Sequence, residues 1–320
     1  MANPSPETTE QFLRGHCNPY DLLLDAASPS LLDLGAGDLS FAEELTTQYL
    51  PRLRQQRTTL TVHCVDRLQP GSQFGGPLHA PPHRLKLLKS QEGLQFKFLG
   101  GQDMFEAVAP NTALPHYTLV TCHAPANPTF AYEPTRVSPE TIERHLRSAK
   151  GDYRVVREAG EAALEVLHGG RALLFPPWKF DVRGPLALLD LMRRRATAVV
   201  LSAMDQDVFW EVLSQVIADP RVRPQDTIFT PAALPDIFGE AYKKLTALPI
   251  GSPVSLADLA TLRDDIPVVL DKSGAPYRFR YVEVSRGAVF GGLPASQTAR
   301  RFSSMKEEAS PWMLVLVPDA

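Results

Sequence analysis

LLDLGAGDLSF, residues 31–41, joins a short apolar run to a glycine turn and to the start of a helical pattern. The run Ser30–Gly35 predicts a buried strand that ends at glycine. Residues 39–56 predict an amphipathic helix, because large apolar side chains recur every four positions: Phe41, Leu45, Tyr49 and Leu53. A strand, a glycine turn and a helix in this order are typical of an α/β sheet.

The pattern continues along the chain. Three further stretches predict strands: Thr59–Val65, Leu94–Leu99 and Tyr117–Cys122. Residues 138–168 predict a long helix broken near Gly151, and the Gly169-Gly170 turn leads into an expected fifth strand at 171–175. Residues 277–290 and 312–317 predict two late strands, which suggest an antiparallel end to the sheet. Strands that alternate with helices indicate a mostly parallel sheet covered on both faces.

Composition limits the class of protein. The 320 residues carry a net charge of −3, which argues against bulk electrostatic binding of nucleic acid but leaves a local basic patch open. Three cysteines without metal spacing fit a reduced, cytoplasmic setting. The polar start of the chain does not resemble a signal peptide, and no apolar run reaches the ~18 residues that predict a membrane span.

The 29 prolines suggest how the chain is divided. Residues 1–10 predict a flexible tail, and 11–175 a cofactor-binding core. Residues 176–276, rich in proline, are too long for a plain connection and predict a helical insertion or cap over the substrate end. Residues 277–320 supply the late strands that complete the sheet.

Three loops at the expected strand ends carry the chemistry. Gly35 and Gly37 let a ligand approach the backbone, and the helix that follows points its positive dipole end at the turn. The third glycine of a full GxGxxG pattern falls at Ser40, so a purely structural turn remains an alternative. Asp66, after the second strand, is placed to accept ribose hydroxyl hydrogens or to cap a helix. Residues 100–104, GGQDM, follow the third strand.

DLGAGDLSF, the strand that ends in VD at 65–66, GGQDM and EAALEVLHGGRALLF at 161–175 together resemble class I S-adenosylmethionine-dependent methyltransferases. The resemblance covers residues 11–175 and is specific to the superfamily. It implies a Rossmann-like, doubly wound, seven-stranded and mostly parallel sheet with an antiparallel last strand. It also implies S-adenosyl-L-methionine as the cofactor.

The resemblance assigns cofactor-binding roles by position. Asp33 would brace the turn and the cofactor's amino group, and Gly35, Ala36 and Gly37 would lie under its methionine part. The ribose and adenine would be held by the remaining set: Asp66, Arg67, Asp103 and Met104.

The fourth strand should end beside the reactive methyl, where His123 is a candidate general base. A packing role for His123 is the structural alternative. Asn127 begins NPTF, an incomplete match to the Asn-Pro-Pro-aromatic motif of amino-directed nucleic-acid methyltransferases. Candidate substrate-pocket residues lie on either side: Arg14, Tyr20, Tyr132, Glu133 and Trp178. No metal site is expected, since Pro81 and Pro82 interrupt the spacing of His79 and His83.

The sequence therefore predicts a methyltransferase whose acceptor is unidentified, with a small molecule slightly favoured by the near-neutral charge. RNA, tRNA or protein acceptors remain open, as does a non-catalytic cofactor-binding protein of the same fold. Aminopropyl transfer would need an acidic pair after the fourth strand, which is missing from residues 123–127. A nicotinamide-dependent dehydrogenase is disfavoured by Ser40 and GGQDM. The sequence does not indicate an oligomeric state.

Overall fold

The computed structural model describes the parts of the chain on which the fold and the site depend. The described residues are 4–16, 18–66, 68–71, 78–102, 114–123, 152–158, 161–168, 171–175, 192–204, 209–210, 213, 240–249, 251–256, 268–270, 276–286 and 312–319.

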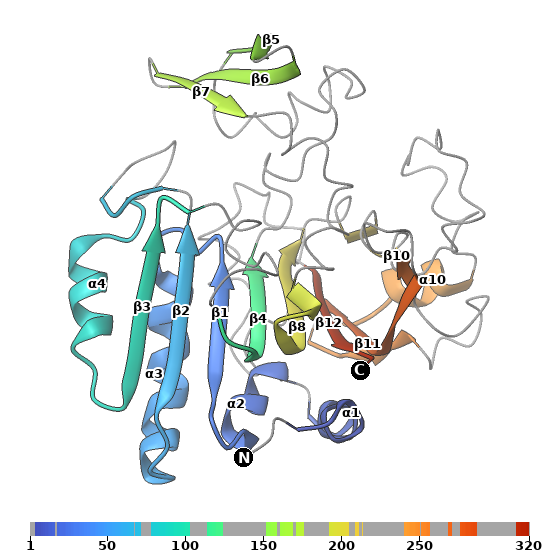
Figure 1. Ribbon diagram of the computed structural model, residues 1–320. Helices are drawn as coiled ribbons and strands as arrows, with labels where there is room; N and C mark the ends of the chain where they lie inside the picture. The colour runs from blue at the N-terminus through green and yellow to red at the C-terminus, as the bar shows by residue number, and fades with distance from the viewer. Residues whose placement is uncertain are drawn as a thin grey trace.

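One large sheet forms the centre of the molecule (Figure 1). Its strands lie in the order β10-β11-β12-β8-β4-β1-β2-β3, and the short β9 pairs with β11. The early strands are β1 (Ser30–Leu34), β2 (Leu60–Asp66), β3 (Leu94–Gly100) and β4 (Tyr117–His123). The later strands are β8 (Ala196–Met204), β9 (Val254–Ser255), β10 (Val268–Leu270), β11 (Pro276–Arg286) and β12 (Trp312–Pro318).

The strand directions confirm a mostly parallel sheet with an antiparallel last strand. β3, β2, β1, β4 and β8 are parallel neighbours, whereas β12 runs antiparallel to both β8 and β11. The sheet has nine strands among the described residues, where seven were expected, because short β9 and β10 each add a partner to β11.

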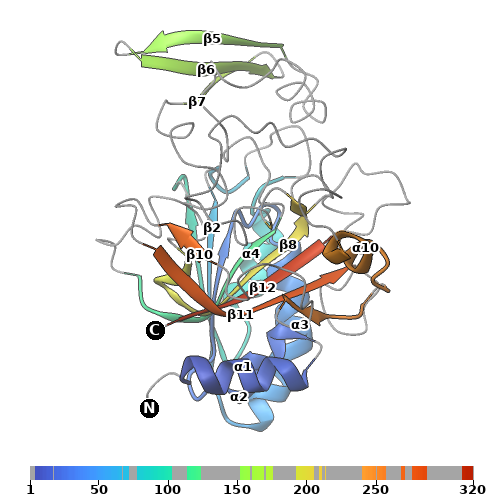
Figure 2. The same ribbon diagram turned by 90° about the vertical axis from the view of Figure 1, so that its right-hand side faces the viewer.

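Helices and short turns cover the sheet. They are α1 (Pro6–Gly15), the 3-10 turn η1 (Pro19–Asp21), α2 (Leu22–Asp25), α3 (Ser40–Gln55), α4 (Pro82–Lys89) and α10 (Glu240–Thr246). The predicted apolar face of α3 is buried, and its members pack with alternate β1, β4 and β8 side chains: Phe41, Leu45, Tyr49 and Leu53. A second core, which includes Leu32, Val120, Trp210 and Trp312, fills the other face. Figures 1 and 2 show α1 and α2 at the end of the sheet where β1 and β4 begin.

The fifth parallel strand is β8, and not residues 171–175 as the sequence suggested. β5 (Asp152–Glu158), β6 (Glu161–His168) and β7 (Arg171–Phe175) form a separate three-stranded antiparallel sheet. The predicted helix over 138–168 is therefore wrong for 152–158 and 161–168. The Ala, Glu and Leu residues of 161–168 favour a helix intrinsically, but pairing with β5 and β7 overrides that weak preference.

The chain is also divided differently from expectation. α1 takes up residues 6–10 of the expected tail, since Ser5 caps it by accepting from the Thr8 amide and Pro6 starts its first turn. β8 lies within the expected insertion 176–276, whose helical part includes α10. Of the described helices, none is long and apolar enough to span a membrane.

Candidate functional site

The strand order reverses between β1 and β4. From β1 the chain proceeds to β2 and β3 on one side, and then returns to β4 and β8 on the other. In open α/β sheets ligands bind at such a switch point, outside the carboxyl ends of the strands. The turn 35–37 after β1 and His123 at the end of β4 both lie there.

The glycine turn is fixed to the tip of β2 by its backbone. The amides of Gly35 and Ala36 both donate to the carbonyl of Val65, at 2.9 and 3.0 Å. Gly35 and Gly37 have φ angles of +75° and +53°, which explains why glycine stands at both positions. A Cβ on Gly37 would meet no atom closer than 4.0 Å, so it would project into the open mouth of the turn.

Asp66 closes one side of this turn. Its Oδ2 accepts from the Gly37 amide at 2.8 Å and its Oδ1 from the Leu68 amide at 2.8 Å. Nδ1 of His79 lies 3.3 Å from Oδ2. Asp66 therefore lies beside the glycine turn, and its ribose-binding role stays a prediction; the sequence analysis did not anticipate the contact with His79.

The loops after β2 and β3 are joined beside Asp66. The Gln102 amide donates to the Asp66 carbonyl at 3.1 Å, and the Gly101 amide to the Leu68 carbonyl at 3.4 Å. Gly101 has a φ of +71°. A Cβ at this position would clash with the side chain of Gln69, because it would lie 2.1 Å from the side-chain nitrogen Nε2. The loop that carries the expected adenine contacts thus starts next to the expected ribose contact. Arg67, Asp103 and Met104 themselves lie outside the described residues.

Asp33 lies beneath the turn and is buried. Its Oδ1 accepts from the Thr121 hydroxyl at 3.2 Å, while Oδ2 is buried without a hydrogen-bond partner. The pKa of Asp33 is raised to about 7, mainly by burial and also by the nearby charge of Asp66, while the Thr121 hydrogen bond opposes the rise. An unpaired buried carboxylate oxygen costs free energy, which a hydrogen-bond donor or cation would recover.

The raised pKa of Asp33 predicts that Asp33→Asn increases the stability of the protein by an amount that depends on pH. A carboxyl whose folded pKa is raised binds its proton more tightly in the folded state, so the wild type loses stability as pH rises from about 4 to about 7. The free energy of unfolding of Asp33→Asn, relative to wild type, should therefore increase over that interval, by about 4 kcal/mol at most, and then level off. Urea unfolding at pH 4, 5.5, 7 and 8 measures it.

Asp38→Asn is the matched control, because its pKa is shifted in the opposite direction. Burial raises the pKa of Asp38, but hydrogen bonds from Ser40 and Arg84 outweigh it, and the net pKa is lowered. Asp38 therefore stabilises the fold above its unfolded pKa, and Asp38→Asn should cost stability at pH 7 and lose that cost at low pH. If the free energies of unfolding of the two variants, each relative to wild type, changed with pH in the same direction, the raised pKa of Asp33 would be contradicted.

His123 is buried at the end of β4 and faces the same side of the sheet as Asp33. Its Nδ1 lies 2.5 Å from the Ser202 hydroxyl of β8, and its ring packs on Phe41 with centroids 3.8 Å apart. Burial lowers the pKa of His123 to about 3. The imidazole is then neutral at pH 7 and is a weaker base than the sequence analysis assumed.

The structure separates the two described pocket candidates. Tyr20 is fully buried in η1, and its ring lies 5.6 Å from Phe41, so it belongs to the layer beneath the turn. Arg14 lies on α1, where it pairs with Glu10 at 3.0 Å and stacks 5.1 Å from the Tyr281 ring centroid. α1 itself is bound to β11, because Arg280 pairs with Glu7 and Glu10. Arg14 is therefore held at β11 and not at the glycine turn.

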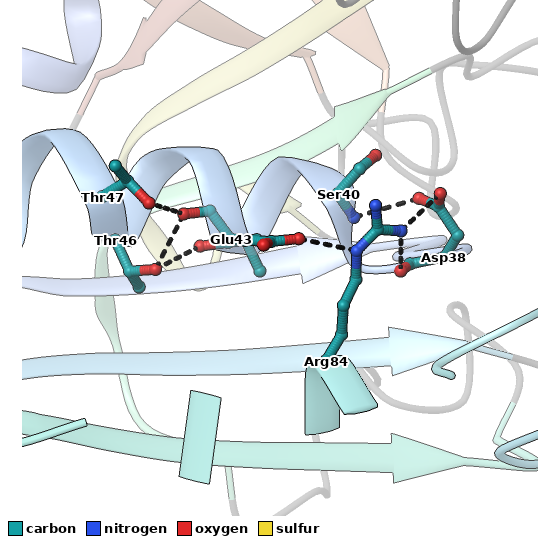
Figure 3. A network of polar contacts seen from close by, with 7 residues as sticks. Asp38, Ser40, Glu43, Thr46, Thr47 and Arg84 are labelled. Carbon is teal, nitrogen blue, oxygen red and sulfur yellow. Dashed lines mark hydrogen bonds and ion pairs between the residues drawn. The ribbon is translucent and has the colours of Figure 1, made fainter. Parts of the chain in front are cut away.

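A polar network fixes the far side of the turn to α4 (Figure 3). Arg84 donates to the Asp38 carboxylate at 2.6 Å, to the Asp38 carbonyl at 2.8 Å and to the Glu43 carboxylate at 2.6 Å. Asp38 also accepts from the Ser40 amide at 3.0 Å, so a carboxylate occupies the start of α3. The sequence analysis did not anticipate Arg84, because acidic residues at the start of a helix are already favoured by the helix dipole and do not by themselves require a cation.

The remaining candidates lie outside the described residues: Asn127, Tyr132, Glu133 and Trp178. Within the part of the chain that is described, no three His, Cys, Asp or Glu side chains are arranged to hold a metal ion.

No family model matches the chain, and no curated protein matches it significantly in sequence. Solved structures give remote likenesses. The plantazolicin methyltransferase BpumL, solved with SAH and a substrate analogue, is 11% identical over 98% of this chain and 83% of its own, with a TM-score of 0.33. The Listeria monocytogenes protein lmo1582, described as a class I S-adenosylmethionine-dependent methyltransferase, is 10% identical over 100% and 63%, with a TM-score of 0.35.

The CMeT domain of the citrinin polyketide synthase is 11% identical over 98% of this chain and 52% of its own, with a TM-score of 0.32. Likenesses at this level support no inference about the chain. The function proposed below therefore rests on its own strand order and on the contacts around the glycine turn.

Proposed function

We propose that this chain is an S-adenosylmethionine-dependent methyltransferase. The observation that carries the proposal is the glycine turn at the switch point, whose Gly37 amide is bound to the carboxylate of Asp66 at the next strand tip. A flexible-backbone turn beside a fixed carboxylate suits a nucleoside, since the turn admits close approach and the carboxylate accepts from ribose hydroxyls.

The charge at the start of α3 favours a nucleoside that carries no phosphate. In a dinucleotide site the pyrophosphate binds the free amides of the helix N-terminus. Here the Asp38 carboxylate accepts from the Ser40 amide, and Glu43 adds a second negative charge, while among the described residues Arg84 alone pairs with these two carboxylates. A pyrophosphate at this point would be repelled by the two carboxylates and could not bind the Ser40 amide, which is already used. This disfavours NAD and favours a cofactor such as S-adenosylmethionine.

The layer beneath the turn suits the amino-acid end of that cofactor. Asp33 has an unpartnered buried oxygen, and a positively charged amino group is the kind of donor that would satisfy it. The residues therefore suit the cofactor in their chemistry as well as in their positions. Asp33 would bind the amino group, Gly35–Gly37 would let the cofactor approach the backbone, and Asp66 would bind the ribose.

S-adenosylmethionine supplies a methyl group on a positively charged sulfur, which an acceptor takes by in-line displacement. What the chain contributes is alignment and the exclusion of water. We assign His123 a positioning role in this, through its contacts with Ser202 and Phe41, because its lowered pKa disfavours proton abstraction. The acceptor we favour is a small molecule, and RNA, tRNA or protein acceptors stay as alternatives. A cofactor-binding protein without turnover would share all of these contacts.

Calorimetric titration tests the proposal with three ligands: S-adenosylmethionine, S-adenosylhomocysteine and NAD. We expect the two sulfur ligands to bind in the micromolar range and NAD to bind at least tenfold more weakly. Asp38→Ala should reduce the difference in affinity between the sulfur ligands and NAD, because it removes the carboxylate from the start of α3. A site that binds neither sulfur ligand, or that prefers NAD, would overturn the proposal.

A further inference from the structure

His79 lies directly on the carboxylate that the proposed function assigns to the ribose. Its Nδ1 is 3.3 Å from Asp66 Oδ2, and the two side chains are 23% and 8% exposed. His79 comes from the segment between β2 and α4, which is distant in sequence from the glycine turn. The contact therefore brings a third element to the mouth of the site, beside β1 and β2.

Backbone hydrogen bonds hold this segment over the turn. The Ala80 amide donates to the Gly37 carbonyl at 2.9 Å, and the Gly71 amide donates to the His79 carbonyl at 2.8 Å. Ala80 has a φ of +39°, an uncommon value for alanine. Residues 78–80, which we call the strap, are thus anchored at the peptide group between His79 and Ala80, which bonds to the Gly37 carbonyl and to the Gly71 amide.

The lone pairs of Asp66 limit what else can bind. An ionised carboxylate offers about four acceptor positions, two on each oxygen. Oδ2 already accepts from the Gly37 amide and faces His79 Nδ1, and Oδ1 accepts from the Leu68 amide. Counting only donors from the described residues, one position remains, on Oδ1, whereas a ribose presents two hydroxyl donors. Asp66 cannot accept from both hydroxyls while His79 occupies Oδ2.

We propose that His79 is a further residue of the cofactor site, which holds Oδ2 of Asp66 while the site is empty and yields it to a ribose hydroxyl. This inference rests on the proposed function only in that the ligand carries a ribose. The Gly37 and Leu68 amides keep the carboxylate in place during the exchange, so Asp66 stays oriented. The cost of displacing His79 is then part of the binding free energy of the ligand.

The first test compares His79→Ala with His83→Ala, a variant of an exposed histidine in α4. Removing the competitor should tighten S-adenosylhomocysteine binding about tenfold, since a hydrogen bond to a charged group contributes about 1.5 kcal/mol. His83→Ala should bind as the wild type does. Equal or weaker binding by His79→Ala would overturn the proposal and would indicate that His79 supports the ligand.

The second test uses ligands that lack one hydroxyl. Adenosine, 2′-deoxyadenosine and 3′-deoxyadenosine are titrated into wild type and His79→Ala. One of the two deoxy compounds should bind wild type and His79→Ala with equal affinity, because it lacks the hydroxyl that needs Oδ2. Adenosine should bind His79→Ala about tenfold more tightly than wild type. Identical gains for all three would contradict competition at Oδ2.

A third measurement needs no altered site. The ring nitrogen NMR signals of His79, assigned by their loss in His79→Gln, should shift when S-adenosylhomocysteine saturates the wild type. Unshifted signals would overturn the inference. If the wild type binds NAD or adenosine and no sulfur ligand, the proposed function fails, and the same variant comparison with those ligands decides the role of His79. If no ribose-bearing ligand binds, both fail.

Discussion

Asp66→Ala should abolish measurable binding of S-adenosylhomocysteine and cost about 2–4 kcal/mol of stability. The carboxylate holds the Gly37 and Leu68 amides, and its loss leaves two backbone donors at the mouth of the site without an acceptor. It also removes the proposed acceptor of the ribose hydroxyls, which should lower affinity at least 100-fold. Calorimetry gives the affinity, and urea unfolding gives the stability.

Asp21→Ala is the control for loss of a carboxylate elsewhere. Asp21 lies in η1, where it accepts from the Tyr49 hydroxyl at 3.1 Å and pairs with Arg52 at 3.6 Å. This variant should lose about 1 kcal/mol of stability and keep its affinity. If Asp66→Ala bound the ligand as tightly as Asp21→Ala does, Asp66 would have a structural role alone.

Gly37→Ala should lower affinity for S-adenosylhomocysteine by at least tenfold while the protein stays folded. The residue has a φ of +53°, so alanine costs about 1 kcal/mol, and its Cβ would project into the open mouth of the turn. That space is where a ligand must approach the backbone. A thermal melt and a calorimetric titration of the same sample separate strain from obstruction.

Gly251→Ala is a control that makes the same substitution at another glycine with a positive φ angle. Gly251 has a φ of +81°, and a Cβ there meets nothing within 4 Å. It precedes β9, away from the β1 turn. Both variants should therefore lose similar stability, and only Gly37→Ala should lose affinity. Equal affinity in the two would exclude the glycine turn from the binding site.

The glycine turn and the carboxylate beside it could be predicted because their sequence signals are local. A strand, two glycines and a helix follow one another in eleven residues at 31–41, and a carboxylate at the end of the next strand needs no knowledge of pairing. Parallel pairing then brings Asp66 to the turn without further information. The buried face of α3 followed from spacing alone.

The fifth strand could not be chosen from the sequence, because two apolar segments qualify. RALLF at 171–175 and ATAVVLSAM at 196–204 both suit a strand, and partner choice depends on contacts distant in sequence. β8 pairs with β4 and β12, whereas β7 pairs with β6. α1, in contrast, has a local signal that the sequence analysis did not use, since Ser5 and Pro6 are a typical N-cap and first-turn pair.

The contacts that the sequence analysis missed join residues that are far apart in sequence and belong to different elements. His79 reaches Asp66, Arg84 reaches Asp38, and Ser202 reaches His123. None of these pairs has a spacing that a helix or strand would reveal. His123 shows the same limit from another direction, because its role as a base depends on a pKa that burial changes and sequence does not express.

The position of β12 has a consequence for how the chain folds while it is being synthesised. Residues 312–318 insert between β8 and β11, so the sheet stays open in its interior until these residues have been synthesised. A nascent chain can pair β1 to β4 early, but β8 keeps an unpaired edge, and α1 lacks Arg280 of β11 until residues near 280 emerge. Exposed strand edges attract other chains. Chains that end before residue 312 should thus aggregate more readily than the folded protein, because their β8 edge has no β12 to cover it.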